Sequence, residues 1–225
     1  FIRQLRAEEM VAQFMAARLD APADFPARNI VFMGMGEPMD NLDEVLRAVN
    51  VLIQSPAPQL RAESITVSTS GVVPGMRRFL AESKASLALS LNATTDEVRS
   101  LVMPQTRTWS IAALLDVLRE DAQRTGGKRE YFIEYVLFGG LNDTDQDADR
   151  LVQLLADVPS RVNLIPYNPY PGTHLTTPSH ERILAFHRRV VGQRQLCLIR
   201  WPRGRDIAAA CGQLALAEST SGARA

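Results

Sequence analysis

A chain of 225 residues suits one domain with a sizeable core, and its two cysteines, Cys197 and Cys211, exclude a disulfide framework. No apolar run reaches the roughly 18 residues that a membrane helix needs, and the first residues do not resemble a signal peptide, so we expect a cytoplasmic protein with no membrane partner. The net charge is zero, but the charges are unevenly distributed along the chain: residues 161–225 carry nine arginines against three acidic residues, a net charge of +6. Such a basic region is compatible with a polyanionic partner or with one face of a solvated helix.

Strand and helix patterns alternate along the chain. The predicted elements are, in order, a helix over 7–18, a strand over 30–33, a helix over 42–53, a strand over 64–70, a helix over 72–83, a strand over 85–91, a short helix starting at 95–97, a helix over 110–124, a strand over 131–138, a helix starting at 142–144, a strand over 162–165, a helix over 178–191, a strand over 196–201 and a short helix over 206–214. Each strand but the last is followed by a helix long enough for a right-handed crossover. The alternation therefore predicts a parallel sheet, either open and doubly wound or a barrel.

The stretch over residues 29–41, NIVFMGMGEPMDN, joins an apolar run to a glycine-rich loop. The run from Ile30 to Met33 predicts a strand buried on both faces, and the two glycines predict a tight loop. Ligands bind at the carboxyl ends of such strands, and Glu37 would offer a negative charge to an ammonium group. The residues alone also allow a plain βα turn, with Asp40 or Asn41 as the helix N-cap and Glu37 solvated.

Five of the predicted strands end in small or polar residues. At the carboxyl ends of successive parallel strands these residues would converge on one site, which favours a barrel or partial barrel with a mouth. Each of them alone could equally be a cap or a turn residue. They are Gly36 and Glu37, Ser68 and Ser70, Ser90 to Asn92, Glu134, and Asn168.

Six stretches occur together and in a fixed order: NIVFMGMGEPMDN, ITVSTSGVVP, LALSLNATTDEVRSLVMP, EYVLFGGLND, VNLIPYNPYPG and DIAAACGQL. In these stretches the chain resembles the RlmN/Cfr family of radical S-adenosylmethionine RNA methyltransferases, from Phe1 to about Leu214. The resemblance implies an α/β fold, a partial (β/α)6 radical-SAM-type barrel over residues 1–214 that misses its first strand and cluster loop. Residues 215–225 would form a flexible tail.

The resemblance also implies the residues that contact S-adenosylmethionine. Gly36 and Glu37 match the family residues that hold the amino end of this cofactor. Asparagine replaces the histidine of the family's Ser-Leu-His contact, so the hydrogen bonds can persist whereas titration near neutral pH cannot. The implied cofactor-binding residues are Gly36, Glu37, Ser68, Ser90, Leu91, Asn92 and Asn168.

Cys211 matches the cysteine that is itself methylated in the family's mechanism. One S-adenosylmethionine methylates this thiolate, and a second is cleaved to a 5′-deoxyadenosyl radical that takes a hydrogen from the methylcysteine. The resulting carbon radical adds to an adenine carbon, and another cysteine resolves the adduct. From the residues alone, Cys211 among small neighbours is either a buried core residue or an accessible thiol.

The family's 4Fe–4S cluster needs three thiolates in a CxxxCxxC loop. This chain has two cysteines, of which Cys211 is already assigned and Cys197 lies in the apolar stretch LCLIR, where it is predicted to be a core residue. We therefore expect no metal ligand within the chain. The cluster loop, the resolving cysteine and an RNA-binding part are expected before Phe1, and the chain as it stands is expected to be truncated and inactive.

The resulting functional hypothesis is methylation of adenine C2 in ribosomal RNA, and also in transfer RNA, by a monomer that receives electrons from a flavodoxin or ferredoxin. Cfr-like methylation at adenine C8 is one alternative, and a non-catalytic RNA-binding remnant of the family is another. A third alternative is an unrelated (β/α)-barrel enzyme with a phosphorylated substrate. The absence of a late Gly-rich phosphate loop counts against that third alternative.

Overall fold

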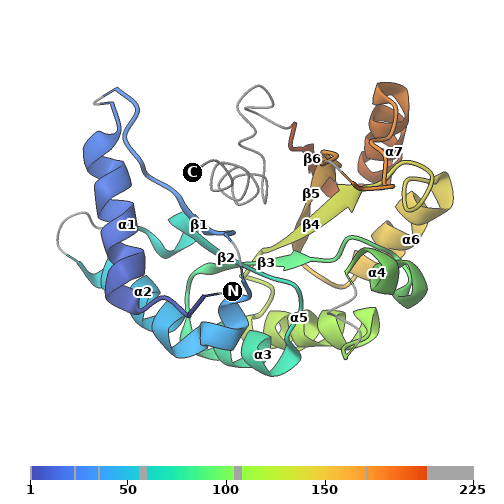
Figure 1. Cartoon of the computed structure of the whole chain (residues 1–225). Helices are drawn as coiled ribbons and strands as arrows, with labels where there is room; N and C mark the ends of the chain where they lie inside the picture. Colours follow the sequence, from blue (N-terminus) through green and yellow to red (C-terminus); the bar gives the residue numbers. More distant parts are fainter. Residues whose placement is uncertain are drawn as a thin grey trace, which may run out of the picture.

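The computed structural model describes residues 2–22, 24–34, 36–55, 60–103, 108–170 and 172–201. Cys211, the helix predicted over 206–214 and the tail over 215–225 lie outside these residues. Within the described residues, six parallel strands form one sheet in sequence order (Figure 1). They are β1 (Ile30–Phe32), β2 (Ile65–Thr69), β3 (Ser86–Ser90), β4 (Tyr131–Leu137), β5 (Ser160–Pro166) and β6 (Leu196–Ile199).

The helices follow the outer side of this curved sheet (Figure 1). Consecutive strands lie side by side, and crossovers of one hand place every connecting helix on the same face, so the sheet is wound on one side only. The described helices are α1 (Ala7–Asp20), α2 (Leu42–Gln54), α3 (Val73–Glu82), α4 (Asp96–Val102), α5 (Ile111–Thr125), α6 (Asp145–Leu155) and α7 (His180–Gly192), with the short 3-10 helices η1 (Pro38–Asn41) and η2 (Ala62–Ser64). Within the described part, none of the helices has the length and apolar character needed to cross a membrane.

Local sequence signals fix where several helices begin and end. A side-chain oxygen accepts a hydrogen bond from the backbone N–H three residues later at Thr95, Ser110, Thr144 and Ser179. Each bond satisfies a donor that the first helical turn would otherwise leave unpaired. Helix α5 ends at Thr125, and the next residue, Gly126, has a φ of 62°, in the left-handed region that glycine adopts without strain.

The two faces of the sheet differ in chemistry. On the outer face most side chains are apolar and buried; Tyr135 of β4, for example, stacks on Phe186 of α7 with ring centroids 5.6 Å apart. The core of the molecule therefore lies between the sheet and its helices. The opposite side, which we call the concave face, carries alternate residues of the strands, and strand register places them level with one another. They include Thr66, Ser68, Ser90, Phe132, Glu134, Arg161, Asn163 and Leu198.

The prediction that the first strand is buried on both faces is wrong. Val31 of β1 is 54% exposed, and neither of its neighbours in the strand is fully buried. In the described sheet β1 is an edge strand that pairs only with β2, and Val31 is level with Thr66 on the concave face, opposite the helices. The apolar run was therefore a correct signal for a parallel strand and an incorrect one for burial.

Candidate functional site

Glu37 lies directly after the loop that ends β1, and hydrogen bonds hold its carboxylate in place. One oxygen accepts from the backbone N–H of Met39 at 3.1 Å, which caps η1. The other accepts from both the backbone N–H and the hydroxyl of Ser70, each at 2.7 Å. Ser70 follows β2, so Glu37 joins the carboxyl ends of two neighbouring strands. The alternative in which Glu37 is merely solvated is wrong.

Gly36 gives this loop its shape. Its φ of 97° lies in the region that favours glycine, and no atom comes within 4 Å of the position that a Cβ would occupy. The space beside the loop is therefore open to a ligand, while the backbone itself requires glycine. An open loop next to a fixed carboxylate fits the ammonium end of an amino acid, such as the methionine part of S-adenosylmethionine.

Of the two serines at the end of β2, the structure joins Ser70 to Glu37. Ser68 is half-buried on the concave face, level with Ala88 of β3. Ser68 therefore lies on the face where a cofactor contact was predicted, two residues before Ser70. The role of Ser70 was missed because the bond depends on where the loop after β1 meets β2, which no local pattern encodes.

Arg99 of α4 ties the ends of β2 and β3 together. Its side chain is only 2% exposed, and its guanidinium donates to the backbone carbonyls of Ser70, Ser90 and Leu91. Burial lowers the pKa of Arg99 to about 10, with the nearby charge of Asp96 acting in the opposite direction. No sequence pattern marks Arg99 as buried, because an arginine on a short helix is usually a surface residue.

The Ser90–Leu91–Asn92 segment occupies the end of β3. Ser90 is half-buried on the concave face, whereas the side chain of Leu91 is fully buried in the core, so any ligand contact of Leu91 must use its backbone. Asn92 has a φ of 57°, and its side-chain oxygen accepts from the backbone N–H of Val136 at 2.9 Å. Its amide group donates to the sulfur of Met103 at 3.1 Å. Asn92 therefore links β3 to β4.

Two polar side chains are paired on the concave face at the next strands. Asn163 of β5 donates to Glu134 of β4 at 2.8 Å, and the strand register makes the two residues direct neighbours. Glu134 is also level with Ser90. Glu134 is recognisable in the sequence as a polar strand residue, whereas its partner Asn163 is not, because Asn163 lies in the middle of its strand.

Asn168, the last of the predicted contacts, follows β5 by two residues and is half-buried. The preceding residue, Tyr167, donates its backbone N–H to the carbonyl of Leu137 at 3.0 Å, so pairing between the two strands continues up to this point. All predicted contacts within the described residues thus lie at or near the carboxyl ends of parallel strands, at one edge of the sheet.

Of the two cysteines, the structure describes Cys197 alone. Cys197 of β6 is buried among the core residues, as predicted, and burial raises the pKa of its thiol to about 12. Cys211 is outside the described residues. In the described part of the chain, no three His, Cys, Asp or Glu side chains are grouped as a metal site. The described residues therefore offer no ligand set for an iron–sulfur cluster.

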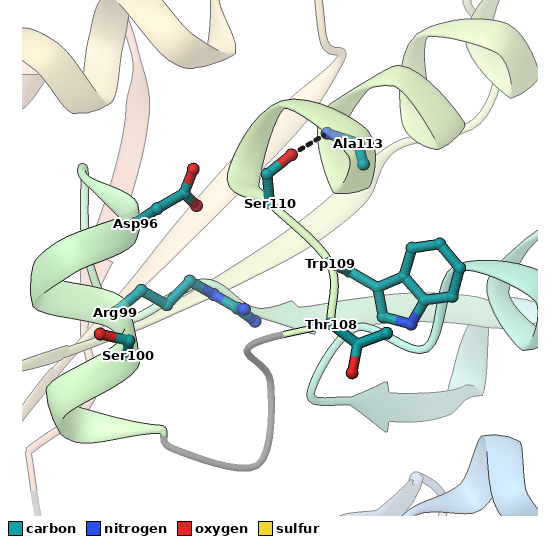
Figure 2. A pocket seen from close by; sticks show the side chains of 7 residues that line it. All are labelled: Asp96, Arg99, Ser100, Thr108, Trp109, Ser110 and Ala113. Carbon is teal, nitrogen blue, oxygen red and sulfur yellow. Dashed lines mark hydrogen bonds between the residues drawn. The ribbon is translucent and has the colours of Figure 1, made fainter.

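A cavity of about 450 Å³ lies between α4 and the start of α5 (Figure 2). None of its described lining residues is a predicted cofactor contact, and Arg99 is the residue that connects it to the strand ends. Figure 2 shows the hydroxyl of Ser110, which accepts a hydrogen bond from the backbone N–H of Ala113. The lining residues are Asp96, Arg99, Ser100, Thr108, Trp109, Ser110 and Ala113.

Comparison with known proteins identifies the family. The model of the radical SAM superfamily matches residues 3–180, which is most of the chain. The chain belongs to the radical SAM superfamily. Members of this superfamily use S-adenosylmethionine and a 4Fe–4S cluster.

Individual relatives agree with the resemblance found in the sequence. The chain is 47% identical over 212 residues to the dual-specificity RNA methyltransferase RlmN of Geobacter sulfurreducens, covering 94% of this chain and 57% of the relative. It is 45% identical to the protein of the same name from Pelobacter propionicus, covering 94% and 60%. A crystal structure of a radical SAM methyltransferase from Sphaerobacter thermophilus superposes with a TM-score of 0.89 at 41% identity, covering 95% of this chain and 62% of that one. The chain thus spans about three fifths of the length of these relatives.

Proposed function

We propose that the protein carrying this chain methylates adenine C2 in ribosomal RNA, and in transfer RNA, through a methylcysteine at Cys211. The observation that carries the proposal is 47% identity over 94% of the chain to an RlmN protein, in a chain that belongs to the radical SAM superfamily. We further propose that the protein acts in the cytoplasm as a monomer, with a flavodoxin or ferredoxin as electron donor. S-adenosylmethionine would supply both the methyl group and the radical.

The protein's own residues would bind and orient this cofactor. Glu37 would accept from its ammonium group through Oε1, which within the described residues carries only the bond from Met39, whereas Oε2 already accepts two bonds from Ser70. Arg99 would keep Ser70 and Ser90 at a fixed separation, because one rigid guanidinium binds the carbonyls of both. A held cofactor reacts faster because its reacting groups are already aligned, and misplacement by about 1 Å can cost about a hundredfold in rate.

Asn92 would act through structure and not through proton transfer. Both polar groups of its side chain are engaged, with Val136 and Met103, and an amide does not titrate near neutral pH. Where the family has histidine, this protein would therefore show no pH dependence from position 92. The backbone carbonyl of Asn92 accepts from Asn142 at 2.8 Å, which fixes the segment further.

The test uses the full-length gene product, reconstituted with iron and sulfide without oxygen and supplied with unmodified ribosomal RNA. We expect mass spectrometry to find methyl groups on adenosine C2 and, in trapped protein, on Cys211. The variant C211A should lose RNA methylation, whereas C197A, which changes a buried core thiol, should retain it. Loss of activity in both variants alike, or wild-type protein that leaves adenosine unmodified, would contradict the proposal.

The same experiment distinguishes the proposed function from two alternatives. Methyl groups on C8 in place of C2 would assign the Cfr-like reaction. Salt-dependent RNA binding without any methylation, by protein that holds no cluster, would assign the RNA-binding remnant.

A further inference from the structure

Glu134 and Asn163 form a buried polar pair in the middle of the concave face. The two residues are Cα partners on β4 and β5, and they are 8% and 5% exposed. The side-chain amide of Asn163 donates to one carboxylate oxygen of Glu134 at 2.8 Å. The pair therefore has a fixed geometry, because both side chains stand on rigid, hydrogen-bonded strands.

An acid at this position is not explained by the fold. Transfer of a carboxylate out of water is costly, and the amide of Asn163 and the charge of Arg200 compensate for it only partly. Burial accordingly raises the pKa of Glu134, although the hydrogen bond from Asn163 and the charge of Arg200 lower it. Apolar residues would fill the same space at lower cost, as they do on the outer face of β4, where Ile133 and Leu137 are fully buried. A perturbed, buried acid on a ligand-facing surface points to binding.

The atoms that remain available define what can bind. Among the described residues, the second carboxylate oxygen of Glu134 and the side-chain oxygen of Asn163 accept no hydrogen bond. Both atoms are acceptors, so a matching ligand must present donors. The pair is level with Ser90, a predicted cofactor contact on the neighbouring strand. The ligand therefore shares the space expected for the cofactor.

We propose that Glu134 and Asn163 form a binding subsite for an adenosine moiety and accept hydrogen bonds from its exocyclic amine or its ribose hydroxyls. This inference rests on the proposed function, in which both S-adenosylmethionine and the target nucleotide contain an adenosine. Glu134 is level with Ser90, a predicted cofactor contact, which favours the adenosine of S-adenosylmethionine over that of the target nucleotide. The experiment distinguishes these two sources of adenosine.

The experiment measures ligand affinity of the reconstituted full-length protein by equilibrium dialysis, with S-adenosylmethionine and a short adenosine-containing RNA as separate probes. The variant E134Q keeps the shape of the side chain and removes its charge. The matched control is E130Q, the same change just before β4 at a carboxylate whose partner is Arg161 at 3.0 Å. We expect E134Q to bind the adenosine-bearing ligand about tenfold more weakly, which is typical for a lost hydrogen bond to a charged group, and E130Q to stay within about twofold.

Each outcome has a distinct meaning. Weaker S-adenosylmethionine binding assigns the subsite to the cofactor, and weaker RNA binding alone assigns it to the target nucleotide. If the wild-type protein binds both probes and E134Q matches E130Q on both, the subsite is overturned while the proposed function stands. If the wild-type protein binds neither probe, the proposed function is overturned together with the subsite.

Two further measurements keep the test independent of folding and identify the donor. Circular dichroism reports whether E134Q is folded, and N163A, which removes the neighbouring acceptor, should weaken binding of the same ligand. An S-adenosylmethionine analogue with oxygen in place of the exocyclic amine should bind the wild-type protein more weakly if the amine is the donor, with no further loss in E134Q. Full affinity of N163A and E134Q for both probes would contradict the proposal.

Discussion

The carboxylate of Glu37 and the hydroxyl of Ser70 are 2.7 Å apart, although 33 positions separate the two residues in the chain. A second bond of 2.7 Å, from the backbone N–H of Ser70, ends on the same carboxylate oxygen. Two bonds to one charged oxygen fix the loop after β1 against the end of β2. Glu37 is therefore both a structural link and the predicted contact for the cofactor's ammonium group.

A double-mutant cycle tests this link. We expect E37A to lower the free energy of unfolding by about 2 kcal/mol and S70A by about 1 kcal/mol, because hydrogen bonds to a charged group are stronger than neutral ones. The double variant should lose less than the sum of the two, by at least about 0.5 kcal/mol, since both changes remove the same bond. Urea unfolding of the four proteins measures the coupling. Strictly additive losses would show that the two side chains do not interact in solution.

The hydrogen bonds from Arg99 to the ends of β2 and β3 predict a large loss of stability when this side chain is replaced. R99M should lower the free energy of unfolding by about 3 kcal/mol, because three backbone carbonyls, of Ser70, Ser90 and Leu91, lose their buried donor. The control is R47M, which removes the exposed ion pair between Arg47 and Glu44 and should cost less than about 1 kcal/mol. Urea unfolding at neutral pH compares the two variants. Equal losses would mean that Arg99 does not hold the strand ends.

The raised pKa of Glu134 predicts a pH-dependent difference between wild-type protein and E134Q. In the folded state Glu134 binds its proton more tightly than an ordinary glutamate carboxyl, whose pKa is 4.5, so wild-type protein loses stability as pH rises through 4.5 toward the folded value. The amide that E134Q introduces does not titrate, so the variant has no such loss. We therefore expect the stability of E134Q relative to wild type to increase between pH 4 and pH 7. Urea unfolding at both pH values measures it, and a constant difference would contradict the burial of a charged Glu134.

The burial of Cys197 predicts slow alkylation. A pKa raised from 9.0 to about 12 lowers the thiolate fraction at pH 8 about a thousandfold, and the thiolate is the reactive form. We expect iodoacetamide to leave Cys197 unmodified in folded protein and to modify it readily in urea. Peptide mass spectrometry after timed labelling measures both rates. Similar rates in the two conditions would place the thiol at the surface.

The sequence by itself determined the order of the described strands and α-helices. Alternating strand and helix patterns, four side-chain N-caps and the left-handed Gly126 are local signals, since each depends only on residues that are close together in the chain. The gathering of polar residues at strand ends also follows from sequence, because parallel strands all present their carboxyl ends at one edge. Residue patterns together with family resemblance therefore placed Gly36, Glu37 and Ser90 correctly at that edge.

Only the tertiary structure decided which of these residues meet. The bonds of Glu37 to Ser70 and of Asn163 to Glu134 join residues 33 and 29 positions apart, and they depend on strand register, to which local patterns are blind. The exposure of Val31 likewise depends on its strand lying at the sheet edge, on the face opposite the helices. The apolar character of a side chain indicates that the residue can be buried. Whether it is buried depends on what the rest of the chain places against it.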